Sequence, residues 1–209
     1  MTHYHPAQVA QNSPHKSAMI MADLGQVTDY RQLVDQSNRL AHAFADAGLR
    51  EGDTAAFLVE NGCPYPELMW AAKNSGIRYV CISTHLGPDD AAYIVRDSEA
   101  RLLVASYGLR DLARRAASLL DSAPKLCMVG GSQAPFLDLD AIAQDSSAQP
   151  LEGVRRRGPS MLYSSGTTGR PKGVRTSIPD APPEEPPQRF AMLQKQYGLG
   201  PDTVFLNPG

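Results

Sequence analysis

The chain has 209 residues, of which 42% are hydrophobic and 20% charged, and its formal net charge is −2. These values are ordinary for a globular protein, and the length allows one large domain or two small ones. The net charge gives no basic field that would attract nucleic acid. No stretch approaches the roughly 20 apolar residues of a transmembrane helix, and the N-terminus does not resemble a signal peptide. We therefore expect a soluble cytoplasmic protein without nucleic-acid or membrane partners.

The first clear element is a helix over residues 29–47. Asp29, followed three residues later by Gln32, resembles a capping box, and the apolar residues that follow fall on one face. Gly48 is a natural C-terminal stop. After a short turn, residues 54–60 form an apolar run that predicts a buried strand.

Helices and strands then alternate along the chain. The strands are apolar throughout, as expected when both faces of a sheet are covered, and the alternation predicts βαβ units with right-handed crossovers. We therefore expect an α/β fold, a doubly wound parallel sheet flanked by helices. The predicted helices cover residues 66–75, 88–98 and 109–120, and the predicted strands cover residues 79–83, 101–106 and 125–129.

The sequence after this unit is less regular. Residues 132–159 are rich in Ala, Gln, Ser and Asp and are interpreted as a connector; the basic run at 155–157 is interpreted as a solvated face. Residues 178–189 hold five prolines and three acids, which predicts an exposed and mobile excursion. A helix-like piece at 190–197 and a strand at 203–206 are expected to follow.

The stretch at residues 162–174, LYSSGTTGRPKGV, carries the chemistry. Its glycines let backbone N–H groups approach a ligand, successive N–H groups form an anion-binding nest, and the hydroxyls and one lysine add donors and positive charge. It is not a Walker A loop, which requires Ser or Thr directly after GK. Ten consecutive ordered positions disfavour the alternative of a flexible surface turn. The predicted polyphosphate-binding residues are Ser164, Ser165, Gly166, Thr167, Thr168, Gly169, Lys172 and Gly173.

This stretch resembles the signature phosphate loop of the adenylate-forming (AMP-binding) superfamily, YTSGTTGxPKGV, with Ser164 where threonine is usual. The superfamily includes acyl-CoA synthetases, firefly-type luciferases and the adenylation domains of peptide synthetases. The resemblance extends upstream over residues 28–100, where Asn61 and the Asp97-Ser98 pair fall at family positions. The chain is most similar to the N-terminal part of a fatty-acid-type acyl-CoA synthetase.

The resemblance implies ATP, Mg²⁺ and coenzyme A as substrates and cofactors of the complete enzyme, with a carboxylic acid as the other substrate. A carboxylate would attack the α-phosphate of ATP, and coenzyme A would then displace AMP. In this family the loop holds the β- and γ-phosphates during the first step. By resemblance, Ser165, Thr167, Thr168 and the loop amides would bind these phosphates, and Lys172 would neutralise their charge.

Later motifs of the family are missing from the sequence, including its Thr-Glu pair and its C-terminal lysine, so no catalytic residue is identified. We therefore expect a fragment, the incomplete N-terminal part of the large adenylate-forming domain, inactive in isolation and prone to self-association. Two alternatives stay open: a non-catalytic nucleotide-binding or interaction remnant, and a luciferase-like or amino-acid-adenylating relative. The expected units are residues 1–28 (N-terminal segment), 29–131 (α/β unit), 132–159 (connector) and 160–209 (phosphate loop and truncated start of a second α/β subdomain).

The remaining candidates favour structural roles. Cys63, Cys81 and Cys127 are widely spaced without a CxxC pair, which predicts three free thiols and no catalytic nucleophile. His3 and His5 form an HxH with no third ligand nearby, so we interpret them as part of a disordered tail and predict no metal site.

Overall fold

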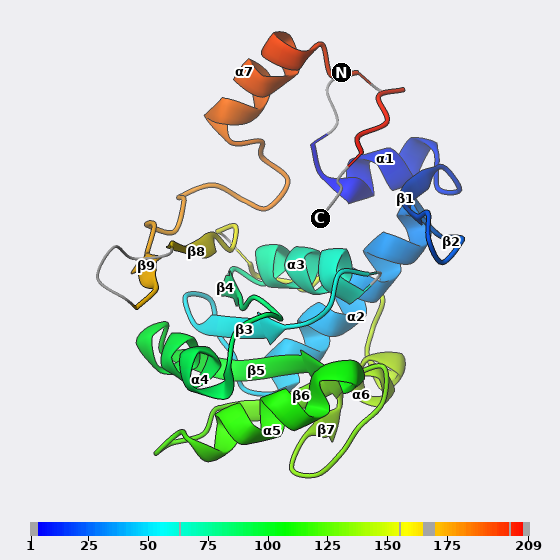
Figure 1. Cartoon of the computed structure of the whole chain (residues 1–209). Helices are drawn as coiled ribbons and strands as arrows, with labels where there is room; N and C mark the ends of the chain where they lie inside the picture. The colour runs from blue at the N-terminus through cyan, green and yellow to red at the C-terminus, as the bar shows by residue number, and fades with distance from the viewer. Residues whose placement is uncertain (1–3, 63, 155, 165–169, 201, 207–209) are drawn as a thin grey trace.

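The computed structural model describes residues 4–62, 64–154, 156–164, 170–200 and 202–206. A seven-stranded sheet in the order β7-β6-β5-β3-β4-β8-β9 forms its centre, with helices on both faces (Figure 1). Within this sheet, every strand pair between described residues is parallel except β8 with β9. The predicted doubly wound α/β fold is therefore confirmed.

The strands and helices of this unit follow the predicted order closely. The strands are β3 (Thr54–Leu58), β4 (Arg78–Cys81), β5 (Ala100–Ser106), β6 (Lys125–Val129), β7 (Leu137–Asp138), β8 (Ser160–Ser164) and β9 (Lys172–Val174). The helices are α2 (Tyr30–Asp46), α3 (Pro64–Asn74), α4 (Pro88–Asp97), η1 (Tyr107–Leu109), α5 (Arg110–Ser118) and α6 (Leu139–Asp145).

Local sequence signals explain where α2 begins and ends. The Asp29 carboxylate accepts from the N–H of Gln32 at 2.8 Å, and the Gln32 side chain accepts from the N–H of Asp29 at 2.9 Å. These two bonds satisfy N–H groups that have no partner within the helix, which confirms the capping box. Gly48 follows the helix with a φ of +87°, a conformation that glycine adopts without strain.

Two apolar cores lie on opposite faces of the sheet, and successive residues of β3 alternate between them. Ala55 and Phe57 pack in the core with residues of α2, α3 and α6. Ala56 and Leu58 pack in the other core with residues of α4 and α5. Burying a large apolar side chain contributes about 1.5–3 kcal/mol, so the double coverage of the central strands is the main source of stability.

The first described residues form α1 (Pro6–Asn12) and a hairpin of β1 (Ser17–Met21) and β2 (Gln26–Asp29) that leads into α2. The expected disordered tail is wrong for His5, whose ring nitrogen Nδ1 accepts from the N–H of Ala7 at 3.2 Å and caps α1. Its Nε2 lies 2.8 Å from Oδ1 of Asn74, and its side chain is buried. His3 lies outside the described residues.

The connector assigned to residues 132–159 contains two elements that the sequence analysis did not predict. Strand β7 pairs with β6 at the sheet edge, and α6 buries Leu139 and Ala143 in the core that contains α2. The interpretation of the basic run as a solvated face is wrong for Arg157, which is only 8% exposed. Arg156 forms an ion pair with Glu51, and Arg155 lies outside the described residues.

The chain beyond β9 is mostly irregular and exposed until α7 (Gln188–Tyr197). In Figure 1, α7 lies apart from the helices that cover the sheet. The excursion at residues 178–189 is irregular as predicted up to the start of α7, although the N–H of Arg157 donates to the carbonyl of Ala181 at 2.8 Å. Its mobility stays a prediction. The predicted strand at 203–206 is wrong, since these residues form no strand and Phe205 is 81% exposed.

In the described ranges no helix is long and apolar enough to cross a membrane.

Candidate phosphate-binding site

The predicted phosphate loop is the connection of an antiparallel hairpin. Strand β8 runs parallel to β4, and β9 returns beside it so that Ser164 pairs with Lys172 and Tyr163 with Gly173. The connection therefore begins at the carboxyl end of β8. In open α/β sheets, ligands bind beyond the carboxyl ends of the parallel strands, so the hairpin presents the loop where such a fold holds a ligand.

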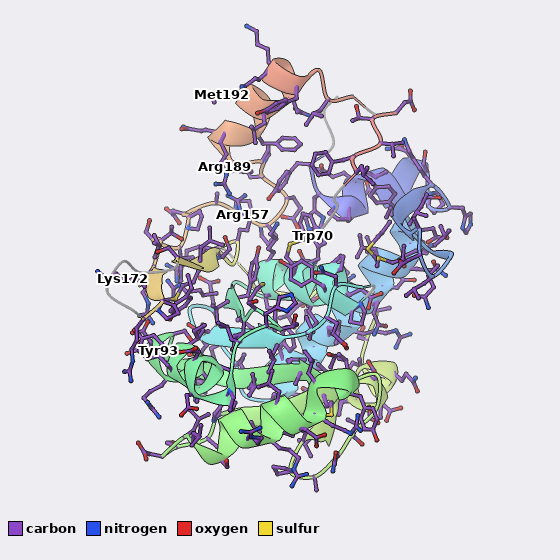
Figure 2. All side chains as sticks on the ribbon, viewed as in Figure 1. Trp70, Tyr93, Arg157, Lys172, Arg189 and Met192 are labelled. Carbon is purple, nitrogen blue, oxygen red and sulfur yellow. The ribbon has the colours of Figure 1, made fainter. Side chains whose placement is uncertain are left out.

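The structure describes part of the predicted site. Ser164 and Lys172 are exposed at the two ends of the connection, and Figure 2 shows Lys172 at the edge of the molecule. No ion pair between described residues involves Lys172. An exposed ammonium group in this position is available to an anionic ligand. The roles predicted for Ser165, Gly166, Thr167, Thr168 and Gly169 concern residues outside the described ranges and stay predictions.

Gly173 has a packing role that the sequence analysis did not foresee. A Cβ atom at this position would lie 2.5 Å from Cε of Met161 and 2.8 Å from Cζ of Tyr163. Both distances are too short for a carbon contact. The glycine thus lets the backbone of β9 lie directly against the Tyr163 ring, whatever its part in binding phosphate.

A hydrogen bond joins the hairpin to the end of α4. The hydroxyl of Tyr163 donates to Oδ2 of Asp97 at 2.6 Å, and the hydroxyl of Tyr93 donates to Oδ1 of the same carboxylate at 3.4 Å. Burial raises the pKa of Tyr163 well above its ordinary value, and the Asp97 carboxylate adds to that increase. The phenol therefore stays protonated and remains a donor at neutral pH.

Two arginines make further contacts here, one with α4 and one with the residues that follow it. The guanidinium carbon of Arg170 lies 5.3 Å from the centre of the Tyr93 ring, within range of a cation–π interaction. Beyond β9, Nη2 of Arg175 lies 2.7 Å from Oε2 of Glu99 and donates to the carbonyl of Ser98 at 3.2 Å. Figure 2 shows Tyr93 and Lys172 on the same side of the molecule. The Asp97-Ser98 pair lies at a family position, but no feature of the sequence connects it to the loop.

The described residues contain no group of three or more His, Cys, Asp or Glu side chains that could hold a metal ion. Cys81 and Cys127 are free thiols as predicted, and Cys63 lies outside the described ranges. Burial raises the pKa of Cys127 to about 11, which keeps it a thiol near neutral pH.

The fold and the hairpin define a doubly wound α/β protein with an exposed lysine, Lys172, paired with the last residue of strand β8. Residues 6–200 match the AMP-binding enzyme family, and the chain belongs to this family.

Several known proteins are similar to this chain. A fatty acid–[acyl-carrier-protein] ligase of Streptomyces coeruleorubidus is 32% identical over 79% of this chain and 30% of its own length. A 3-hydroxybenzoate–CoA/4-hydroxybenzoate–CoA ligase of Thauera aromatica is 33% identical over 79% of this chain and 32% of its own length. The crystal structure of an anthranilate CoA ligase in complex with anthranoyl-AMP superimposes with a TM-score of 0.71 at 25% identity, covering 82% of this chain and 34% of that chain. The chain thus spans about a third of the length of these relatives.

Proposed function

We propose that this chain supplies the ATP phosphate-binding part of an enzyme that activates a carboxylic acid as its acyl-adenylate. The observation that carries the proposal is the β8–β9 hairpin, whose connection joins Ser164 to an exposed Lys172 that forms no ion pair with another described residue, in a chain of the AMP-binding family. The solved relative named as a complex with anthranoyl-AMP supports this reaction, because anthranoyl-AMP is an acyl-adenylate.

In the proposed reaction, the hairpin forms no covalent bond with the substrates. A carboxylate oxygen attacks the α-phosphorus of ATP, the bond from that phosphorus to the bridging oxygen breaks, and pyrophosphate leaves with the electron pair. Donors fixed around the β- and γ-phosphates hold the nucleotide in line and stabilise the charge that grows on pyrophosphate. Lys172 and the hydroxyls of the loop are the groups proposed for this role. A thiol such as that of coenzyme A then displaces AMP.

We propose a carboxylic acid without naming which one. The two named relatives act on different acids, and their sequence identities to this chain are nearly equal: 32% for the fatty-acid enzyme and 33% for the hydroxybenzoate enzyme. A fatty acid is the substrate class that the motif resemblance favours. The described residues offer no carboxylate cluster for Mg²⁺, and we assign no step to that ion.

An ATP analogue with an acyl group on its γ-phosphate tests the site directly, because it acylates lysines that lie beside the phosphates. We expect Lys172 to be labelled and excess pyrophosphate to block the label. Lys195, an exposed lysine on α7, is the matched control and should stay unlabelled. Equal labelling of the two lysines, or labelling that pyrophosphate does not reduce, would contradict the proposal.

A further inference from the structure

The last residue of α4 and the residues directly after it contact strand β8 and the residue that follows β9. On the β8 side, Tyr163 donates to Asp97 at 2.6 Å. Directly after β9, Arg175 reaches Glu99 at 2.7 Å. In the β8–β9 register, the pair of Tyr163 with Gly173 is next to the pair of Ser164 with Lys172, from which the loop starts. A contact that holds Tyr163 therefore fixes the backbone one residue from the loop.

Asp97 stands where helix electrostatics disfavour it. It is the last residue of α4, and the C-terminal end of a helix carries a partial negative charge that repels a carboxylate. Among the described residues its side-chain partners are two phenol hydroxyls rather than a cation. A carboxylate at this end of the helix is electrostatically unfavourable, and the hydrogen bond from Tyr163 is an interaction that offsets this cost.

Glu99, two residues after Asp97, has an unfavourable backbone conformation. Its φ of 54° makes it the one non-glycine residue with a positive φ in the described ranges, a conformation that is unfavourable for a residue with a Cβ. That backbone places the Glu99 carboxylate against Arg175, while the carbonyl of the buried Ser98 accepts from the same guanidinium. The two unfavourable positions thus both make contacts at the hairpin: Asp97 with Tyr163 of β8, and Glu99 with Arg175 directly after β9.

We propose that Asp97 is a positioning residue for phosphate binding: it holds the Tyr163 hydroxyl and so orients the β8–β9 hairpin for Ser164 and Lys172 to meet one polyphosphate ligand. Glu99 and Arg175 restrain the opposite strand. This inference rests on the proposed function and names the element that orders its site. Asp97 does not touch the ligand; it acts through Tyr163 and Gly173.

Pyrophosphate titration of the 209-residue chain tests the acceptor role. We expect Asp97→Ala and Tyr163→Phe each to weaken pyrophosphate binding about three- to tenfold, the range of one hydrogen bond. Asp97→Asn should restore most of the affinity, because its amide oxygen still accepts the hydroxyl. Tyr93→Phe, which loses only the 3.4 Å contact, is the matched control and should bind within about twofold of wild type. Equal losses for Asp97→Asn and Asp97→Ala would overturn the inference.

A double-mutant cycle separates positioning from general destabilisation. If Asp97 acts by orienting Lys172, Asp97→Ala should cost little further affinity in a Lys172→Ala background, since the group that it orients is gone. A loss of the same factor in both backgrounds would show that Asp97 does not work through Lys172.

Amide hydrogen exchange tests the contact without any ligand. Asp97→Ala should speed exchange in β8 and β9 at least about threefold and leave α5 and β6 unchanged, while Asp97→Asn should exchange as wild type. Failure of the wild-type chain to bind pyrophosphate would contradict the proposed function. The exchange result would then show only whether Asp97 holds the β8–β9 hairpin in place. Unchanged exchange in β8 and β9 of Asp97→Ala would overturn the inference whatever the binding result.

Discussion

Strand β3 and the β8–β9 hairpin belong to one sheet but are held in place by different forces. All five residues of β3 are buried, and the strand lies between β4 and β5. In the hairpin, Leu162 and Val174 form a register pair and are 68% and 56% exposed. The first region is fixed by apolar burial on both faces, whereas the second buries Met161 in one core and depends on a few directional contacts to α4.

This difference separates folding from function. A change in β3 removes packing that the whole unit shares, so its effect should appear in the free energy of unfolding. A change that removes only one of the hairpin's polar contacts to α4 should alter the geometry of the loop more than global stability.

The largest effect is expected at Phe57, which is fully buried and stacks between Phe44 and Tyr79 with ring centres 6.3 and 6.1 Å apart. Phe57→Ala should lower the free energy of unfolding by about 3–5 kcal/mol, because it removes buried area and leaves a cavity. Phe205→Ala removes an 81% exposed ring and should change stability by less than about 0.5 kcal/mol. Similar urea midpoints for the two variants would show that Phe57 does not lie in the buried core.

A smaller loss is expected at Gly173. Gly173→Ala pushes a methyl group against Met161 and the Tyr163 ring, and overpacking of this kind costs about 1–3 kcal/mol. Gly200→Ala is the control, since a Cβ atom there meets nothing within 4 Å. Thermal unfolding measures both. If Gly173→Ala is as stable as Gly200→Ala, the close packing of β9 on Tyr163 is refuted.

Glu67 on α3 gives a pH-dependent effect away from the hairpin. Burial, with a contribution from Asp140, raises the pKa of Glu67 from 4.5 to about 7. The folded state therefore binds more protons than the unfolded state between these values, so this group lowers stability as pH rises from about 4.5 to 7. Glu67→Gln should remove that loss and stabilise the protein by about 1–2 kcal/mol at pH 8, with little gain at pH 4.5.

The matched control for this pH effect is Glu152→Gln, which alters an exposed glutamate. Its stability relative to wild type should stay constant across the same pH range. Urea unfolding at pH 4.5, 6 and 8 gives the comparison. A gain for Glu67→Gln that is independent of pH would mean that the Glu67 carboxyl titrates normally in the folded state.

The same contrast explains how much could be predicted from sequence. The buried strands were predictable because apolar runs such as that of β3 need two covered faces, and α2 because Asp29 and Gln32 form a capping box. Strand β7 has two residues and α6 has seven, too few for a periodic pattern to emerge. Local propensity could not predict the burial of Arg157, because its contacts come from residues distant in sequence.

The candidate site divides in the same way. Its loop residues could be proposed because glycines, hydroxyls and a lysine occur together in one short stretch, and their role stays a prediction. Its support could not be proposed, since Tyr163 and Asp97 are 66 residues apart and no spacing rule connects them. The packing role of Gly173 also depends on strand β9, which is three residues long and has no signature of its own.

Calorimetric titration of pyrophosphate into wild type, Lys172→Ala and Lys195→Ala tests the central claim most directly. Both variants lose one exposed lysine, but only Lys172 lies at the loop. Charge-assisted hydrogen bonds contribute about 1.5–3 kcal/mol, so Lys172→Ala should bind at least about tenfold more weakly, with Lys195→Ala unchanged. Equal pyrophosphate affinity for all three proteins would contradict the claim that the β8–β9 hairpin is the phosphate-binding site.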